Sequence, residues 1–173
     1  VDAGNNSKNP YPSLASLALA ALNTRYLAGA IITHPDKDHY GGLESILMRH
    51  EILSGGAVWL REEHLQFTKT VQILATLERW QVPIRFLDRK QNPYPHLFCM
   101  LLHPHHYSTN NLSPLCKFTL ASGRTILLTG DMDQSLEKQY IASNPIFLKS
   151  DYLKIAHHGS ASSSSSEFLE AVG

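Results

Sequence analysis

Apolar runs separated by polar turns predict a mixed α/β fold. Short, β-branched runs that stop at turn residues predict strands at 27–32, 57–60, 82–87, 97–102, 115–120, 125–128 and 151–156. Apolar residues at helical spacing predict helices at 14–22, 43–50, 62–80, 134–141 and from about 167. Polar stretches at 5–13 and 88–95 are interpreted as loops, and 121–124 as the turn of a hairpin. No internal repeat or linker interrupts the pattern, which indicates one domain over residues 1–173.

The composition fits a single globular domain. The chain has 173 residues, 43% of them hydrophobic, which is enough to bury one substantial core. Its formal net charge is zero, so any binding of nucleic acid has to be local. No run approaches the ~20 apolar residues of a membrane span, and no signal-peptide pattern is present. The chain lacks an initiating Met and opens on what resembles a strand end, so we expect a fragment of a longer protein.

Two cysteines, Cys99 and Cys116, lie in different predicted strands. Two cysteines cannot define a disulfide scaffold, and without a CxxC pair they do not indicate a structural zinc site. We expect buried thiols rather than a bridge, and the pattern leaves the cellular compartment undecided.

A dense group of potential metal ligands follows the strand predicted at 27–32. Four ligands fall within six residues, in the order His34, Asp36, Asp38 and His39. Side chains at this spacing cannot all point the same way, so they can serve one metal from alternate positions or divide between two adjacent metals. Pro35 favours an extended backbone before it, and Gly41 and Gly42 permit a close turn into the next helix. The alternative is a solvated acidic loop with incidental histidines.

Two later strand ends also carry possible ligands. Asp131 follows an apolar strand and a glycine, where a carboxylate could bridge two cations or, alternatively, cap the next helix. Asp133 suits the first turn of that helix. His157 and His158 follow the strand at 151–156, and alternate strand side chains face opposite ways. One imidazole would therefore bind metal while the other faces the substrate or supports the site, and we favour His158 as the ligand.

A serine-rich run precedes the last predicted helix. Ser160 and the serines within 162–166 could cap the helix that starts near Glu167, and their hydroxyls could hold an anion together with its first amides. A flexible linker is the alternative. The apolar residues beyond Glu167 favour the capped helix.

Three of these stretches, in this order, resemble signatures of the metallo-β-lactamase fold. His34-x-Asp36-x-Asp38-His39 resembles the first signature, usually HxHxDH, in the HxDxDH form of the ComEC family of DNA-uptake channels. Leu127-Leu128-Thr129-Gly130-Asp131 resembles the strand that ends in a bridging aspartate, and residues 153–160 resemble the LKxxHHGS signature. The likeness runs from Asp2 to about Ser166. It implies an α/β chain with the metallo-β-lactamase-like αββα sandwich, incomplete at one or both ends.

The resemblance implies a role for each motif residue. The implied metal ligands are His34, Asp36, Asp38, His39, Asp131 and His158, with Asp38 and His157 taking part in catalysis. Asp2 would orient a ligand histidine, although a simple Asp-Gly turn explains it nearly as well. The implied substrate-binding residues are Asn110, Asn111, Ser113 and Ser160. The nearby His103, His105 and His106 would belong to a substrate-side loop rather than bind metal.

The expected reaction is metal-dependent hydrolysis. Two divalent ions in such a site lower the pKa of bound water and stabilise negative charge on the substrate. Asp36 replaces the usual histidine by a hard, charged oxygen ligand. This favours Mn²⁺, with Zn²⁺ or Mg²⁺ possible, and suits phosphodiester substrates.

The family also implies a biological setting. The domain would be a nuclease or phosphodiesterase of a DNA-uptake (competence) membrane protein and would degrade the strand that is not imported. Single-stranded DNA would be its substrate, and the remainder of a membrane channel its partner. It would be a soluble domain attached to the bacterial cytoplasmic membrane on its outer face. The alternatives are a stand-alone hydrolase of a small ester or phosphoester, and a degenerate domain that binds DNA without catalysis.

Overall fold

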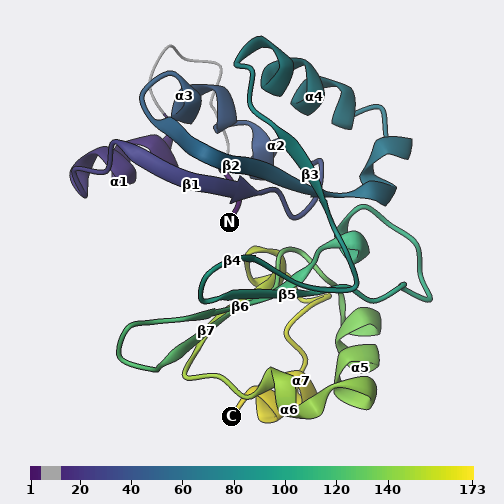
Figure 1. Cartoon of the computed structure of the whole chain (residues 1–173). Coiled ribbons are helices and arrows are strands. Elements are labelled where there is room, and N and C mark those ends of the chain that lie inside the picture. The colour runs from purple at the N-terminus through teal and green to yellow at the C-terminus, as the bar shows by residue number, and fades with distance from the viewer. Residues whose placement is uncertain (5–12) are drawn as a thin grey trace. The chain divides into compact units, whose positions relative to one another are not determined.

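The computed structural model describes residues 1–4 and 13–173. The loop predicted at 5–13 therefore lies almost wholly outside the described residues. Strands and helices are mixed along the chain, which confirms the α/β class. The described residues form two compact units, Val1–Phe86 and Leu87–Gly173, and each is a sheet with helices (Figure 1).

The N-terminal unit contains a three-stranded sheet in the order β1 (Tyr26–Ile31), β2 (Glu51–Arg61) and β3 (Ile84–Leu87). Its helices are α1 (Leu14–Ala21), α2 (Lys37–Tyr40), α3 (Leu43–Leu47), η1 (Glu62–Gln66) and α4 (Thr70–Arg79). Strands β1 and β2 run parallel, with Ile31 beside Trp59. Buried residues of α3, α4 and β2, such as Ile46, Leu77 and Val58, form one hydrophobic core. Because β1 and β2 are parallel, their carboxyl ends lie at the same edge of the sheet.

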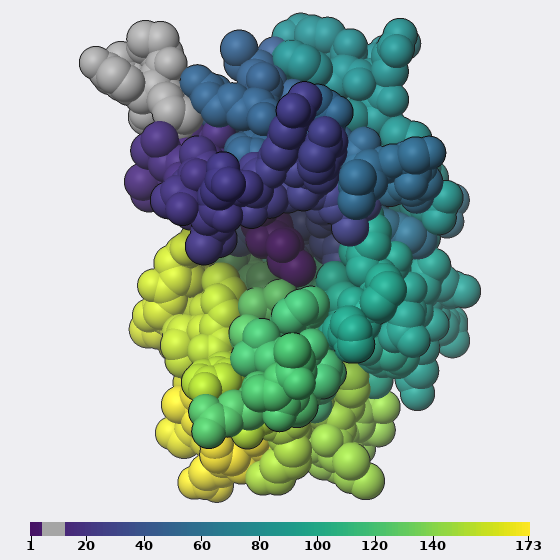
Figure 2. All heavy atoms as spheres, turned by 60° about the vertical axis from the view of Figure 1, so that its left-hand side comes forward, coloured from purple at the N-terminus to yellow at the C-terminus, as the bar shows by residue number. Residues whose placement is uncertain are grey.

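The C-terminal unit contains a five-stranded sheet in the order β4 (Lys90–Tyr94), β5 (Leu97–Met100), β6 (Leu115–Thr119), β7 (Thr125–Leu128) and β8 (Tyr152–Lys154). Its helices are η2 (Asn110–Leu112), α5 (Gln134–Ser143), α6 (Pro145–Leu148), η3 (Ala156–Gly159) and α7 (Ser166–Val172). Strands β4 to β7 pair antiparallel, whereas β7 and β8 are parallel because α5 and α6 connect them. Figure 2 shows the turn between β6 and β7 in green at the front of this unit. Leu127, Leu136, Tyr140 and Phe168 belong to its core.

Most predicted elements are present, and four of the differences are instructive. The loop predicted at 88–95 contains β4, because its backbone pairs with β5 despite a polar sequence. The helix predicted at 62–80 is divided into η1 and α4, because Phe67 between them is extended. Strand β2 begins before the predicted residue 57. Strand β8 ends at Lys154, so the strand predicted at 151–156 is too long.

The expectation of free thiols was wrong. Cys99 and Cys116 lie directly opposite each other on β5 and β6, with their Cα atoms 4.2 Å apart, and they form a disulfide. Both side chains are fully buried, as expected. The sequence did not reveal the pairing because strand register, which places the two residues side by side, is a tertiary property.

Among the described residues, no helix combines the length and the apolar character that crossing a membrane requires.

Candidate metal centre

The first ligand group lies at the carboxyl end of β1. Thr33 and His34 follow the strand after Ile32, and both are almost completely buried. Asp36 is the N-terminal cap residue of α2, and that short helix carries Asp38 and His39. Strand and helix thus present all four residues of the first motif within one connection.

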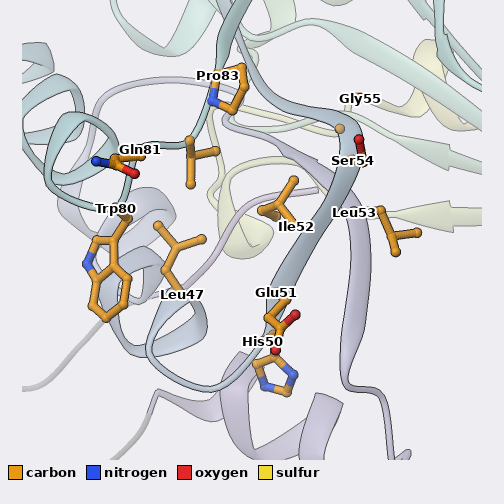
Figure 3. A pocket seen from close by; sticks show the side chains of 12 residues that line it. Leu47, His50, Glu51, Ile52, Leu53, Ser54, Gly55, Trp80, Gln81 and Pro83 are labelled. Carbon is orange, nitrogen blue, oxygen red and sulfur yellow. The ribbon is translucent and has the colours of Figure 1, made fainter.

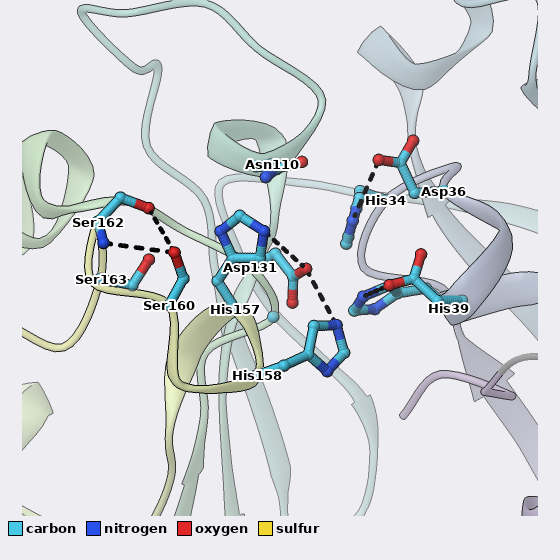
Figure 4. A network of polar contacts seen from close by, with 12 residues as sticks. His34, Asp36, His39, Asn110, Asp131, His157, His158, Ser160, Ser162 and Ser163 are labelled. Atoms are coloured by element: carbon cyan, nitrogen blue, oxygen red, sulfur yellow. Dashed lines mark hydrogen bonds and ion pairs between the residues drawn. The ribbon is translucent and has the colours of Figure 1, made fainter.

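Hydrogen bonds hold the two imidazoles of this group in place. The rings of His34 and His39 lie 3.9 Å apart between centroids. The Thr33 Oγ1 atom lies 3.1 Å from Nδ1 of His34 and 3.4 Å from Nδ1 of His39. Their Nε2 atoms lie near carboxylates, at 3.9 Å from Oδ2 of Asp36 for His34 and 3.7 Å from Oδ2 of Asp38 for His39 (Figure 4). The Nε2 atoms and the carboxylates therefore form the donor set.

Asp2 orients this group. Its Oδ2 atom lies 3.0 Å from Nδ1 of His39, and its carboxylate also accepts from the amide and hydroxyl of Thr33 at 2.8 and 2.9 Å. A carboxylate on the far nitrogen of a ligand histidine fixes the tautomer and the ring orientation. The main chain of Asp2 donates to the Ile31 carbonyl, which anchors the N-terminal residues beside β1.

Gly42 is required by the close approach of the N-terminal residues. Its amide donates to the Gly4 carbonyl at 2.8 Å, and a Cβ atom at Gly42 would collide with the Ala3 carbonyl oxygen. Gly42 therefore has a packing role besides permitting a turn. Its lack of a side chain lets the segment that carries Asp2 pack against the ligand loop, which is the segment from His34 to His39.

Asp36 has a second partner, which the sequence did not indicate. The Lys69 ammonium group lies 2.6 Å from Oδ1 of Asp36. The Oδ2 atom of the same carboxylate faces His34. Lys69 precedes α4, far from the motif in sequence, and no local pattern connects the two residues.

The second ligand group lies where the parallel strands β7 and β8 end. Gly130 adopts a left-handed conformation with φ 54°, which turns the chain after β7. Asp131 then lies almost completely buried, and its amide donates to Oγ of Ser113 at 3.2 Å. Thr129 donates from its hydroxyl to the Lys154 carbonyl at 2.7 Å, which ties the two strand ends together. Ser113 is itself buried, so it positions Asp131 instead of reaching outward.

His157 and His158 do not alternate across a strand. Both have left-handed backbone conformations, with φ of 48° and 52°, and Gly159 continues the turn. Their Nε2 atoms lie 3.9 and 3.3 Å from Oδ2 of Asp131, so both rings face the same carboxylate (Figure 4). The premise of opposite faces was therefore wrong, because β8 ends before these residues. Left-handed backbone is costly for residues other than glycine and often occurs at functional sites.

Asp133, not Asp131, caps helix α5. Its carboxylate accepts from the amides of Ser135 and Leu136 at 2.8 and 3.2 Å. Burial acts to raise the pKa of Asp133, but hydrogen bonds from Ser135, Asn111 and Leu136 outweigh it and lower this pKa. The helix-capping role considered as an alternative for Asp131 is therefore performed by Asp133. Asp133 is the cap residue of α5 and not only an acidic residue of its first turn, as was expected.

Asn111 is a structural residue. Its side chain is fully buried, donates to Asp133 at 2.8 Å and to the His106 carbonyl at 3.2 Å, and accepts from the Asp133 amide. This use of the amide does not fit the substrate-binding role expected for Asn111. Asn110 is half-buried, and Ser160 shares a hydroxyl contact of 3.0 Å with Ser162. The exposed residues His103, His105 and His106 lie in the loop between β5 and η2.

The serine run forms a capped helix, as predicted. Ser165 caps α7 and accepts from the Phe168 amide. The buried carboxylate of Glu137 accepts from the amides of Ser164 and Ser165. An external anion is therefore not needed at these two amides, since an internal carboxylate takes that place. A cavity of about 490 Å³ is lined by Ser160, Ser163 and neighbouring residues. It lies next to the histidine turn, which consists of residues 157–159.

Another cavity, of about 440 Å³, lies in the N-terminal unit (Figure 3). Leu47, Ile52, Trp80 and Pro83 belong to its walls, and His50 and Glu51 lie at one end. Its strand residues come from the start of β2, whereas the ligand loop follows the end of the parallel strand β1. The cavity is thus at the opposite end of the strands from the ligand group.

The donor sets of both units fit divalent metal ions. Imidazole nitrogen and carboxylate oxygen are ligands for Zn²⁺ and Mn²⁺, and each unit gathers them within 4 Å of one another at a strand end.

Sequence reasoning missed Thr33, Lys69 and Lys154. Thr33 and Lys154 stand inside or next to motifs and could have been noticed; the Lys154 ammonium lies 4.0 Å from Asp131.

Comparison with known proteins agrees with the motifs. The chain is 27% identical over 160 residues to ComE operon protein 3 of Bacillus subtilis (strain 168), covering 89% of this chain and 20% of that protein. It is 28% identical over 158 residues to Competence protein ComA of Neisseria gonorrhoeae, covering 90% of this chain and 20% of that protein. No protein-family model matches the chain. The chain thus spans about a fifth of the length of these relatives.

The chain is therefore similar to part of two proteins of bacterial competence. More narrowly, both similarities support the resemblance of the three motifs to the ComEC family.

Proposed function

We propose that this chain is a metal-dependent phosphodiesterase domain that acts on single-stranded DNA during DNA uptake. The observation that carries the proposal is the arrangement at the two sets of strand ends. Histidine and carboxylate groups lie close together there, and hydrogen bonds to the side chains of Asp2 and Ser113 hold the segments that carry them. A purely structural loop would not need buried histidines beside carboxylates. The competence relatives supply the connection with DNA uptake.

The residues that would hold divalent ions are His34, Asp36, Asp38, His39, Asp131 and His158. Two such ions, with Mn²⁺ favoured and Zn²⁺ or Mg²⁺ possible, would supply Lewis acidity and a nucleophile derived from water. Asp2 and Thr33 would keep the imidazole Nε2 atoms of His34 and His39 directed at the ions. His157, beside Asp131 and partly exposed, would exchange a proton with the reacting groups.

Substrate contacts would come from the polar surface next to the histidine turn. Ser160 lines the cavity of the serine run, and its hydroxyl can donate to a phosphate oxygen. Lys154, whose side chain is 41% exposed, adds a positive charge beside Asp131. Because the net charge of the chain is zero, such local contacts would supply its attraction for DNA.

Two finer features complete the proposal. Each unit supplies one sheet with helices, the content that a metallo-β-lactamase αββα sandwich requires. The Cys99–Cys116 disulfide suits an oxidising compartment, which agrees with a place on the outer face of the cytoplasmic membrane, joined to the rest of a channel protein.

The test is hydrolysis by the purified 173-residue chain with added Mn²⁺. Labelled single-stranded DNA, bis-p-nitrophenyl phosphate and a p-nitrophenyl ester are offered in parallel. Cleavage of DNA that stops with a chelator supports the nuclease proposal. Turnover of only the small substrates would favour the small-ester or phosphoester hydrolase instead. No turnover by folded, metal-loaded protein would favour a domain without catalysis.

A further inference from the structure

We propose that Lys69 neutralises the extra carboxylate of the first motif and thereby weakens the binding of divalent cations there. The inference rests on the proposed metal-binding role of Asp36. Its evidence is the 2.6 Å ion pair between Nζ of Lys69 and Oδ1 of Asp36. The other oxygen of Asp36 faces Nε2 of His34 at 3.9 Å, so one carboxylate is shared between a cation and the ligand group.

The position of Lys69 is unfavourable for its own helix. Lys69 occupies the N-terminal cap of α4 and makes no capping hydrogen bond from its side chain. Its backbone is already helical, with φ −58° and ψ −31°, and the positive end of the helix dipole repels a cation there. The ammonium is also 57% exposed, and an exposed ion pair contributes little to stability. The stability of α4 therefore does not explain the residue, whereas compensation of Asp36 does.

The charge balance of the motif gives the consequence. In the HxHxDH form the position of Asp36 holds a neutral imidazole, and here it holds a carboxylate. An ammonium at hydrogen-bond distance restores the net charge of the usual motif while keeping a hard oxygen as ligand. Asp36 in place of a histidine has two effects, a change of the donor atom from nitrogen to oxygen and an added negative charge. Lys69 cancels the added charge and leaves the oxygen donor in place.

Calorimetric titration of the 173-residue chain with MnCl₂ and with ZnCl₂ tests this role. Lys69→Met removes the charge and keeps the apolar part of the side chain. The dissociation constants of both metals should fall by about threefold to tenfold, because a point charge acts on all divalent ions alike. Lys69→Arg should stay within about twofold of the unmutated chain, since the positive charge is retained.

Two controls define the outcome. Lys37→Met removes an exposed lysine next to Asp36 in sequence and should change the dissociation constants by less than about twofold. In the Asp36→Asn chain, Lys69→Met should tighten binding less, which shows that the two residues are coupled. Unchanged or weaker Mn²⁺ binding by Lys69→Met overturns the role of Lys69 and leaves the metal site standing. A folded, unmutated chain that binds neither metal overturns both.

Discussion

At the scale of single residues, the ligand loop is organised by groups outside the motif. Thr33 and Asp2 fix the imidazole rings, and Gly42 allows the main chain beside Asp2 to approach. The sequence motif names the ligands but not these supports, because hydrogen bonds between residues over thirty positions apart depend on the fold. Asp2 was found only through the family resemblance, and Lys69 had no signal at all.

The metal preference of the site depends on Asp36. A carboxylate at this position favours Mn²⁺, so the unmutated chain is expected to bind Mn²⁺ more tightly than Zn²⁺ at equal free concentration. Asp36→His supplies a nitrogen ligand and should reverse this order. Isothermal titration with both metals measures it. Stronger zinc binding by the unmutated chain would show that the oxygen ligand does not set the preference.

The two histidines of the second group are expected to differ in function. His158 lies nearer to Asp131, at 3.3 Å, so His158→Ala should lower the metal content of the purified chain. His157→Ala should keep the metal but slow turnover, because its ring would act on the reacting groups. Metal analysis and steady-state kinetics on both variants provide the measurement. Equal loss of metal from the two variants would rule out this division.

At the scale of elements, strands β1 and β7 were easier to predict than the turn that follows β8. The apolar runs before both ligand groups gave β1 and β7 almost to the residue. The turn at 157–159 could not be predicted, because a left-handed run of two histidines and a glycine contradicts local backbone preference and is held by tertiary contacts. One such contact joins the His157 amide to the Gly130 carbonyl at 3.2 Å.

Helix α5 gives a prediction on pH dependence. The pKa of Asp133 is lower in the folded chain than in the unfolded chain, because its hydrogen bonds outweigh the effect of burial. Its stabilising contribution is therefore fully present above the unfolded pKa of about 3.9 and is lost as the pH falls through the folded value. Asp133→Ala should lower the free energy of unfolding by about 1 kcal/mol at neutral pH.

Urea denaturation of both proteins over a range of pH measures this effect. The difference between Asp133→Ala and the unmutated chain should shrink below about pH 4. Asp133→Asn is the matched control, because asparagine caps helices well without a charge. A difference that does not depend on pH would mean that the ionised carboxylate is not the group that stabilises α5.

At the scale of the whole molecule, fold class was predictable and register was not. Alternating apolar runs and helical patterns were enough for the α/β class. Polar β4 and the Cys99–Cys116 pairing both depend on which strands lie side by side. Such long-range pairing leaves little trace in local sequence, which explains why a loop and free thiols were expected instead.

The disulfide gives a prediction about global stability. It closes a loop with a sequence separation of 17, so its reduction should lower the free energy of unfolding by about 3 kcal/mol. Denaturation with and without a reductant measures the change. Alkylation of the unfolded, non-reduced chain is the control, and mass analysis should find no modified cysteine. Two alkylated cysteines in protein prepared under oxidising conditions would contradict the bridge.

Cleavage of labelled single-stranded DNA by the chain and by Asp131→Ala, with added Mn²⁺, tests the central claim most directly. The unmutated chain should cleave slowly, because its net charge of zero leaves only local contacts to attract DNA. Cleavage should stop with a chelator, which removes the ions, and should fall as added salt screens those local contacts. Asp131→Ala should abolish cleavage while the circular dichroism spectrum stays unchanged, and Asp133→Asn should remain active as the neighbouring control. Equal cleavage by the unmutated chain, Asp131→Ala and the chelator-treated sample would point to a contaminating nuclease. No cleavage by the folded, metal-loaded chain would contradict the proposed nuclease function.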